Sequence, residues 1–273
     1  MQPTLNIIGA GHVGRVLGRL LASQYVLQDV LTRSPASAQD AIAFIGAGSA
    51  AASPGAMRRA DVWLLAVGDD QIAPVCAQLA AAQALAGAVV FHCSGARSSA
   101  ALAAARQDGA LTASVHPIRS FADPAQVAAD FDGTFCGIEG DAGALELLTP
   151  ALLAIGARLA PIDAAAKTVY HAASVFASNY LVTVLDAALR AYQAAGIPEH
   201  LARELARPLA TETLANVFRL GPEQALSGPI ARGDMDTVAR QQAAIDAWDE
   251  PSGALYQALV TATTDLARRR KSS

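Results

Sequence analysis

Short apolar runs alternate with longer amphipathic stretches through the first part of the chain. Apolar runs of strand length, bounded by Gly, Ser or charged residues, are typical of strands buried on both faces of a parallel sheet. We expect strands at residues 5–8, 25–32, 61–67, 88–92, 110–115, 134–138 and 157–162. Because helical segments separate these runs, the pattern predicts an α/β fold built on a doubly wound parallel sheet.

The pattern changes at Asp163, after which only helical periodicity continues. Helices are expected at residues 164–195, 198–220, 236–248 and 252–270. Asp163 fits the N-cap of the first of them, Gly196 would end it, and Pro208 would kink the second. We therefore predict two domains, an α/β domain at 1–163 and an all-α domain at 164–273, in keeping with the chain length.

Composition narrows the function classes. The chain is 53% hydrophobic and 16% charged, with a net charge of −4, which favours a large core and argues against nucleic-acid binding. The three cysteines are far apart and form no ligand spacing, so we expect neither a metal site nor a disulfide framework. The first apolar run stops at Gly9, too early for a signal peptide, and the uncharged stretch 72–96 is interrupted by polar residues. A cytoplasmic protein without a membrane partner is expected.

A glycine motif follows the first predicted strand. Its residues are Gly9, Ala10, Gly11, His12, Val13 and Gly14, and a helical pattern starts directly after them. This strand–turn–helix context is the one that the Rossmann dinucleotide fingerprint requires. Gly9 would allow a tight turn, Gly11 the close approach of a pyrophosphate, and Gly14 close packing of helix and strand. A looser match at 46–51 follows a helical segment and is interpreted as a connection.

The end of the second predicted strand indicates which dinucleotide is bound. An acidic residue there would accept from the ribose 2′-hydroxyl of NAD, whereas Arg with small hydroxyls would accommodate the 2′-phosphate of NADP. The strand ends in Thr32-Arg33-Ser34, and the competing acid, Asp29, lies inside the strand pattern. We therefore expect NADP, with NAD as the less favoured alternative. The competing interpretation of Arg33 is a solvated loop cation.

Further polar residues follow the other predicted strands. Val67 and Gly68 follow one strand, Ser94 the next, and His116 the one after that. Since ligands bind beyond the carboxyl ends of parallel strands, these residues are expected on one rim, near the nicotinamide. Ser94 would also suit a helix N-cap, and His116 an ordinary loop position.

The first long helix carries a narrow polar stripe. Residues 168–185 are so apolar that we expect them to be buried on all sides. Lys167, His171, Ser174 and Ser178 fall within about 60° of one another at helical periodicity. Burial and the helix dipole would lower the pKa of Lys167, as a catalytic lysine requires. The alternative is an exposed Lys167 at a frayed helix start, with serines that only pack.

One loop of the helical domain has candidate chemistry. Gly228-Pro229 and Gly233 interrupt the helical pattern around Arg232. Arg232 could hold a substrate carboxylate through two parallel hydrogen bonds. Equally, it could pair with Asp234 or Asp236 and be structural.

These features together resemble the 6-phosphogluconate dehydrogenase-like superfamily. The resemblance rests on the Gly9–Gly14 motif, the order of sheet and helices, and Lys167 four residues before His171. In its β-hydroxyacid dehydrogenases, a lysine and an asparagine four residues later bind and protonate the substrate oxygen. The resemblance implies this role for Lys167, whereas His171 replaces the asparagine and departs from the pattern.

Other segments are similar to a bacterial group of Rossmann-like, NADP or deazaflavin-dependent-reductase-like proteins with a helical C-terminal domain of unknown function. They are FHCSG at 91–95, VHP at 115–117, YHAA at 170–173, ASNY at 177–180 and LSGPIARGD at 226–234. Pyrroline-5-carboxylate reductase is a more distant relative in architecture. The resemblance implies a homodimer formed through the helical domain.

The expected function is an NADP-dependent oxidoreductase that transfers a hydride between nicotinamide and a small carbonyl or imine. Lys167, or His171 by relay, would donate the proton, with His116 on the rim. Ser174, Ser178 and Arg232 would contact the substrate. The alternative is a non-catalytic, NADP-binding sensor or regulatory protein.

Overall fold

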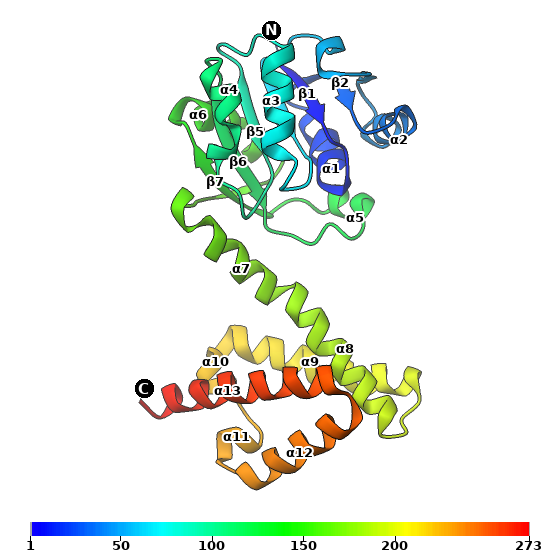
Figure 1. Cartoon of the computed structure of the whole chain (residues 1–273), viewed down its shortest axis with the longest axis vertical. Coiled ribbons are helices and arrows are strands. Elements are labelled where there is room, and N and C mark those ends of the chain that lie inside the picture. Colours follow the sequence, from blue (N-terminus) through cyan, green and yellow to red (C-terminus); the bar gives the residue numbers. More distant parts are fainter. Residues whose placement is uncertain (1, 273) are drawn as a thin grey trace. The chain divides into compact units, whose positions relative to one another are not determined.

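The computed structural model describes residues 2–272 and shows two compact units (Figure 1). The first ends at Ala177 and the second begins at Ser178. The first unit is an α/β domain, and the second is all-α. The predicted fold class is confirmed: a mostly parallel Rossmann sheet is followed by a helical region.

The described residues of the first unit form an eight-stranded sheet in the order β3-β2-β1-β4-β5-β6-β7-β8. Its strands are β1 (Thr4–Ile8), β2 (Val26–Leu31), β3 (Ser49–Ala50), β4 (Val62–Leu65), β5 (Val89–His92), β6 (Leu111–Pro117), β7 (Phe135–Gly140) and β8 (Arg158–Pro161). All seven predicted strands are present, and the two-residue β3 is an addition. The predicted looser glycine match is confirmed as a connection, since it links a helix to β3.

Strand β7 runs antiparallel to β6, so this one pair departs from the predicted parallel sheet. The helix between them, α5 (Pro124–Ala129), covers only about 9 Å, whereas β6 covers about 23 Å. Helix α5 also packs on α1 (His12–Leu21) instead of running back along β6. The chain therefore returns to the sheet at the edge where β6 ended.

Helices cover both faces of this sheet. They are α1, α2 (Pro35–Ile45), α3 (Ile72–Ala82), α4 (Ala103–Gln107), α5 and α6 (Ala142–Ala154). Helix α7 (Lys167–Ala177) follows β8 and is buried only at Lys167, where it starts. Within β4, Leu64 belongs to one hydrophobic cluster, while Trp63 and Leu65 belong to the other. This alternation buries the central strands on both sides, which explains their continuous apolar sequences.

The second unit consists of helices α8 (Asn179–Ala194), α9 (Glu199–Leu220), α10 (Pro222–Ala225), α11 (Pro229–Arg232), α12 (Met235–Trp248) and α13 (Glu250–Ser272). The predicted helix 164–195 is divided into a 3-10 turn, α7 and α8, because Ser178 has non-helical dihedral angles. Pro208 lies within α9, and α10 and α11 are additions to the predicted elements.

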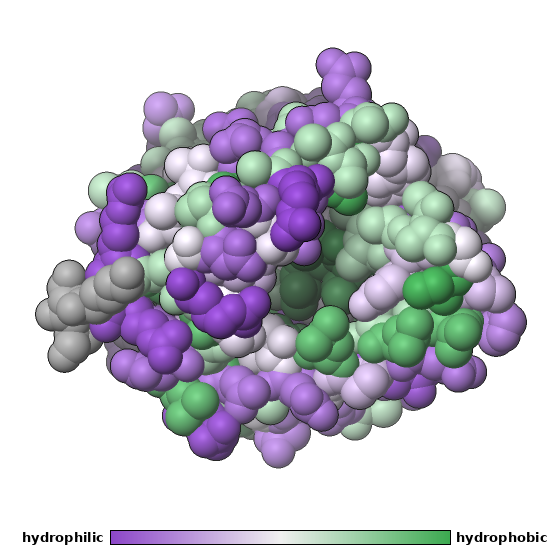
Figure 2. Space-filling view, turned by 90° about the horizontal axis from the view of Figure 1, so that it is seen from below, coloured by the Kyte–Doolittle hydropathy of each residue, from purple (hydrophilic) through white to green (hydrophobic). Residues whose placement is uncertain are grey.

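The helical run that was expected to be buried on all sides is exposed in the described chain. The exposed fractions are 76% for Val169, 70% for Phe176 and 67% for Val182. Apolar residues also gather beside a hollow in the view from below (Figure 2). Exposing large apolar side chains to water is unfavourable, so these exposed residues are suited to contact with another molecule.

Candidate functional site

The glycine motif forms a tight turn between β1 and α1. Gly9 has a φ of 86°, and a Cβ on it would lie 2.6 Å from Cγ1 of Val67. A Cβ on Gly14 would lie 2.8 Å from that of Ala66, so helix and strand approach closely. A Cβ on Gly11 would meet nothing within 4 Å. Packing within the chain therefore explains Gly9 and Gly14, whereas the space beside Gly11 suits an external group.

The first turn of α1 is suited to an anion. Gly11 is its N-cap, no side chain caps the described helix there, and its first turn contains no acidic residue. The backbone amides at such an end carry partial positive charge. Ala10 is buried, Val13 packs against the core, and Nδ1 of His12 lies 2.6 Å from the carbonyl oxygen of Phe121. These residues fit a pyrophosphate.

Arg33, which follows the end of β2, is exposed. Asp29, the acid that could have bound a ribose hydroxyl, is engaged elsewhere. Asp29 is buried, and its carboxylate lies 2.7 Å from Nη2 of Arg58. Burial opposes the charge of Asp29, but the hydrogen bonds from Arg58 keep the pKa of this carboxyl below its usual value. Ser34 caps α2 by accepting from Ser37 N, and Thr32 Oγ1 donates to the carbonyl oxygen of Ser34 at 2.8 Å. The helix start and Arg33 together fit a phosphate.

The carboxyl ends of β1, β4 and β5 lie on one rim because these neighbouring strands are parallel. Gly9 follows β1, Val67 and Gly68 follow β4, and Ser94 follows β5. The Oγ of Ser94 accepts hydrogen bonds from the amides of Ala96 and Arg97, so this residue stabilises a turn. The expected gathering of these residues on one rim therefore follows from the strand order.

His92 stabilises this turn through hydrogen bonds that involve both of its ring nitrogens. Its Nδ1 accepts from the Ser94 amide at 3.1 Å, and its Nε2 lies 3.1 Å from the Ser98 carbonyl oxygen. Burial lowers the pKa of His92 to about 4. His92 is therefore neutral near pH 7, with its proton on Nε2.

Lys167 is buried at the start of α7. Its exposed fraction is 2%, and its Nζ donates to the Ser94 carbonyl oxygen at 2.8 Å and to Oγ of Ser114. Nζ also lies 3.7 Å from Oε1 of Glu139, which accepts from Ser99 N at 2.7 Å. Burial lowers the pKa of Lys167, while the nearby Glu139 opposes this shift. The alternative of an exposed, frayed position is therefore wrong.

Two histidines and a tyrosine lie beside this lysine. Nδ1 of His116 lies 2.8 Å from the Tyr170 hydroxyl, and the rings of His116 and His171 have centroids 5.7 Å apart. A Cβ on Gly95 would overlap Cδ2 of His171 and lie 2.8 Å from Nε2 of His116. Gly137 similarly leaves room for the Tyr170 hydroxyl. Both glycines thus allow α7 to approach the sheet edge.

The remaining predicted substrate residues lie on different elements. Ser174 is half-buried in α7, and Ser178 is exposed at the start of the second unit. Arg232 ends α11 and lines a hollow of about 680 Å³ together with Ser227 and Arg270. No ion pair of Arg232 is present in the described part of the chain, although its charge helps to lower the pKa of Asp234.

Sequence reasoning did not include Tyr170, Ser114, Glu139 and Gly95 among the site residues. Tyr170 lies three residues after Lys167 and therefore shares its helix face. Glu139 is a lone acid in an apolar strand, which is a signal for a buried partner. Ser114 and Gly95 carried no local signal, because their roles arise from side chains that are distant in sequence.

Family comparisons divide the chain into two parts. Residues 2–117 match a family described as the Rossmann-like domain. Residues 134–263 match DUF2520, a domain of unknown function. The chain thus combines a Rossmann-like domain with a DUF2520 domain. No curated protein matches this chain.

Solved structures share the fold over nearly the whole chain. A Bacteroides fragilis protein proposed to be an NADP oxidoreductase has 18% identity and a TM-score of 0.80, covering 97% of this chain and 98% of its own. Protein TM1727 from Thermotoga maritima has 27% identity and a TM-score of 0.72, covering 98% and 100%. An imine reductase from Myxococcus stipitatus in complex with NADP⁺ has 17% identity and a TM-score of 0.66, covering 98% and 93%.

Proposed function

We propose that this chain is an NADP-dependent oxidoreductase that reduces a small carbonyl or imine. The observation that carries the proposal is the pair of histidines over Gly95, at the sheet rim that also holds the glycine turn. Such a reduction requires a side chain beside the dinucleotide site that can donate a proton to the substrate. The similarity in fold to an NADP-bound imine reductase supports this reaction class.

The proposed cofactor site combines the two helix starts. Residues 9–14 would hold the pyrophosphate, Thr32, Arg33 and Ser34 would hold the 2′-phosphate, and Val67, Gly68 and Ser94 would border the nicotinamide. The ion pair of Asp29 with Arg58 supports NADP over NAD, because this acid is engaged elsewhere. When bound, the nicotinamide would supply the hydride.

We assign proton donation to His171, with His116 as its neighbour at the rim. Both ring nitrogens of His171 lack a hydrogen-bond partner within residues 2–272, so they remain available to a substrate. The Nζ of Lys167, in contrast, is occupied by Ser94, Ser114 and Glu139. We therefore propose that Lys167 acts by holding α7, and with it His171, against the sheet.

The substrate residues of the helical region are also proposed. Ser174 and Ser178 would contribute hydroxyls, and Arg232 would bind a carboxylate. The absence of an ion pair at Arg232 among the described residues supports binding over a purely structural role.

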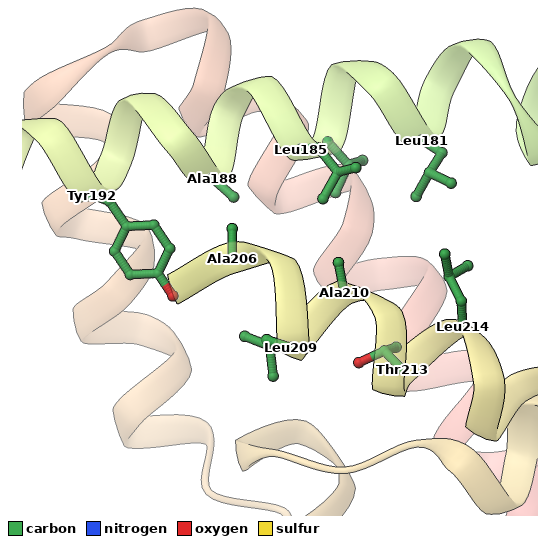
Figure 3. Close-up of a pocket in the computed structure, with 10 residues that line it drawn as sticks. Leu181, Leu185, Ala188, Tyr192, Ala206, Leu209, Ala210, Thr213 and Leu214 are labelled. Carbon is green, nitrogen blue, oxygen red and sulfur yellow. The ribbon is translucent and has the colours of Figure 1, made fainter. Parts of the chain in front are cut away.

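We further propose that the protein is a homodimer. Helices α8 and α9 enclose an apolar groove of about 240 Å³, in which Leu181 and Leu185 point toward α9 while Ala210 and Leu214 point toward α8 (Figure 3). Val182 on α8 and Phe218 on α9 are further large apolar residues that are exposed. A second copy of the chain is the proposed occupant.

A membrane is the competing explanation, since the helical run Ala164–Ala194 is long and apolar enough to cross one by length and composition. However, Lys167 near the start of this run is fixed to Glu139 inside the first unit. Asp186 and Arg190 also lie within the run and form an ion pair. Charged groups are costly in a bilayer, so we favour the dimer.

The test combines binding with turnover. Thermal unfolding is measured without ligand, with NADPH and with NADH, and NADPH oxidation is then followed with a panel of cyclic imines and small aldehydes and ketones. We expect NADPH to raise the Tm more than NADH, because binding only to the folded state stabilises it. NADPH oxidation with one substrate class would support the proposal that the protein is an enzyme. Binding without turnover would favour the sensor, and no Tm shift with either nucleotide would overturn the cofactor assignment.

A further inference from the structure

Tyr170 and His116 form a hydrogen bond that links α7 to the edge strand of the parallel part of the sheet. The Tyr170 hydroxyl lies 2.8 Å from Nδ1 of His116, and the two rings meet edge to face with centroids 5.6 Å apart. Tyr170 reaches this position because Gly137 has no side chain, since a Cβ there would lie 2.9 Å from Cζ of Tyr170. The arrangement fixes the His116 ring.

The hydroxyl proton of Tyr170 has one acceptor in this arrangement. The hydroxyl makes no hydrogen bond other than that to His116 in the part of the chain that is described. If Nδ1–H donated to Tyr170, the hydroxyl proton would lack an acceptor in the protein, and Nε2 of His116 would keep an unused lone pair. Donation from Tyr170 to Nδ1 uses the hydroxyl proton and the Nδ1 lone pair, and it leaves the Nε2 proton for an acceptor from outside the chain.

We infer that Tyr170 fixes the tautomer of His116, so that Nε2 of a neutral ring carries its proton and donates a hydrogen bond to the carbonyl oxygen of the substrate. Tyr170 is then a positioning residue and His116 a catalytic one. This inference rests on the proposed function for the substrate, but the tautomer itself does not depend on it.

The surroundings of His116 keep both groups in the required protonation states. Burial and, to a smaller extent, the charges of His171 and Lys167 lower the pKa of His116 to about 4, while Asp69 opposes this shift. Burial raises the pKa of Tyr170 to about 12. The ring is therefore neutral, and the phenol protonated, throughout the neutral pH range. A neutral imidazole N–H can polarise a carbonyl while His171 supplies the proton.

The tautomer can be measured directly by NMR on the full-length protein with ¹⁵N- and ¹³C-labelled histidine. The chain has only five histidines, and the spectrum of His116→Gln assigns the signal. At pH 7 we expect His116 to show a protonated Nε2 and an unprotonated Nδ1. His92 is the internal control, since the Ser94 amide fixes the same tautomer there.

In Tyr170→Phe, we expect the His116 signals to move to a mixture of tautomers while those of His92 stay unchanged. If wild-type His116 carries its proton on Nδ1, the inference is wrong, and this result is decisive even if the variant fails to fold. Unchanged His116 signals in a folded Tyr170→Phe would also overturn it.

Turnover separates this inference from the proposed function. We expect Tyr170→Phe to lower kcat about tenfold, as loss of an orienting partner does, and to leave the NADPH-induced Tm shift unchanged. Wild type without turnover would refute the proposed function while the NMR result still decides the tautomer. Unchanged kcat together with a scrambled tautomer would refute the catalytic part of the inference.

Discussion

The ammonium group of Lys167 lies 3.7 Å from the carboxylate of Glu139, and both side chains are almost completely buried. Glu139 is further held by Ser99 through the amide and the hydroxyl. Removing one member of a buried ion pair leaves the other charge without compensation, which is more costly than losing an exposed pair.

We therefore expect Lys167→Met to lower the free energy of unfolding by about 3–5 kcal/mol. Lys167→Met combined with Glu139→Gln should recover part of this loss, because the buried charge is removed. Urea unfolding curves test both variants. Arg203→Met is the control, since its ion pair with Glu199 is exposed and should be worth less than about 1 kcal/mol. Equal losses in Lys167→Met and Arg203→Met would contradict the role of the buried pair.

His92 should make the fold sensitive to acid. The pKa of folded His92 is about 4, below the ordinary histidine value of 6.5, so between these values the unfolded chain binds a proton that the folded chain does not. The free energy of unfolding should therefore fall as pH falls through this window, by about 3 kcal/mol at most from this group, and the loss should level off below pH 4.

This acid sensitivity can be measured by urea unfolding at pH 7 and pH 4.5. The comparison is with His92→Gln, whose amide can accept or donate a hydrogen bond but does not titrate. The variant should lose less stability between the two pH values than wild type. Equal losses of unfolding free energy in wild type and His92→Gln would show that other titratable groups control the sensitivity to acid.

Arg33→Asp should reverse the cofactor preference. The substitution places a carboxylate where the 2′-phosphate of NADP is proposed to bind, so NADPH affinity should fall at least tenfold while NADH affinity is kept or increased. Titration calorimetry with both nucleotides measures the two effects. Arg219→Asp, in α9, is the control for net charge, and an equal loss of NADPH affinity in that variant would argue against a local role for Arg33.

Sedimentation equilibrium tests the proposed dimer. Wild type should have twice the 27.9 kDa chain mass, and Val182→Glu should weaken association by at least tenfold because it buries a charge in the interface. Leu153→Glu is the control, since Leu153 is similarly exposed on α6 in the first unit. A monomeric wild type at micromolar concentration would refute the dimer.

The order of strands and helices was predictable from the sequence because it follows from short-range periodicity. The position of the glycine turn was predictable for the same reason, since Gly9 and Gly14 are determined by packing against the adjacent strand. The direction of β7 was not, because it depends on where α5 packs rather than on the residues of β7.

The candidate site shows the same division. Periodicity placed Lys167 and His171 on one helix face and indicated the lowered pKa of Lys167. The partners of Lys167 could not be predicted, because Ser94 and Ser114 lie 73 and 53 residues earlier in the chain. The sequence predicted Lys167, or His171 by relay, as the proton donor, and in the structure Tyr170 and His171 are the residues of α7 that lie beside His116.

The sequence by itself thus determined the fold class, the glycine turn and the helical second part, because each depends on neighbouring residues that follow a strand or helix period. Only the tertiary structure decided which buried charge meets Lys167, which tyrosine holds His116, and that the apolar helices α7 and α8 are exposed in the described chain. Those features depend on contacts between segments that are distant in sequence. A local sequence pattern does not indicate which distant side chain will be the partner after folding.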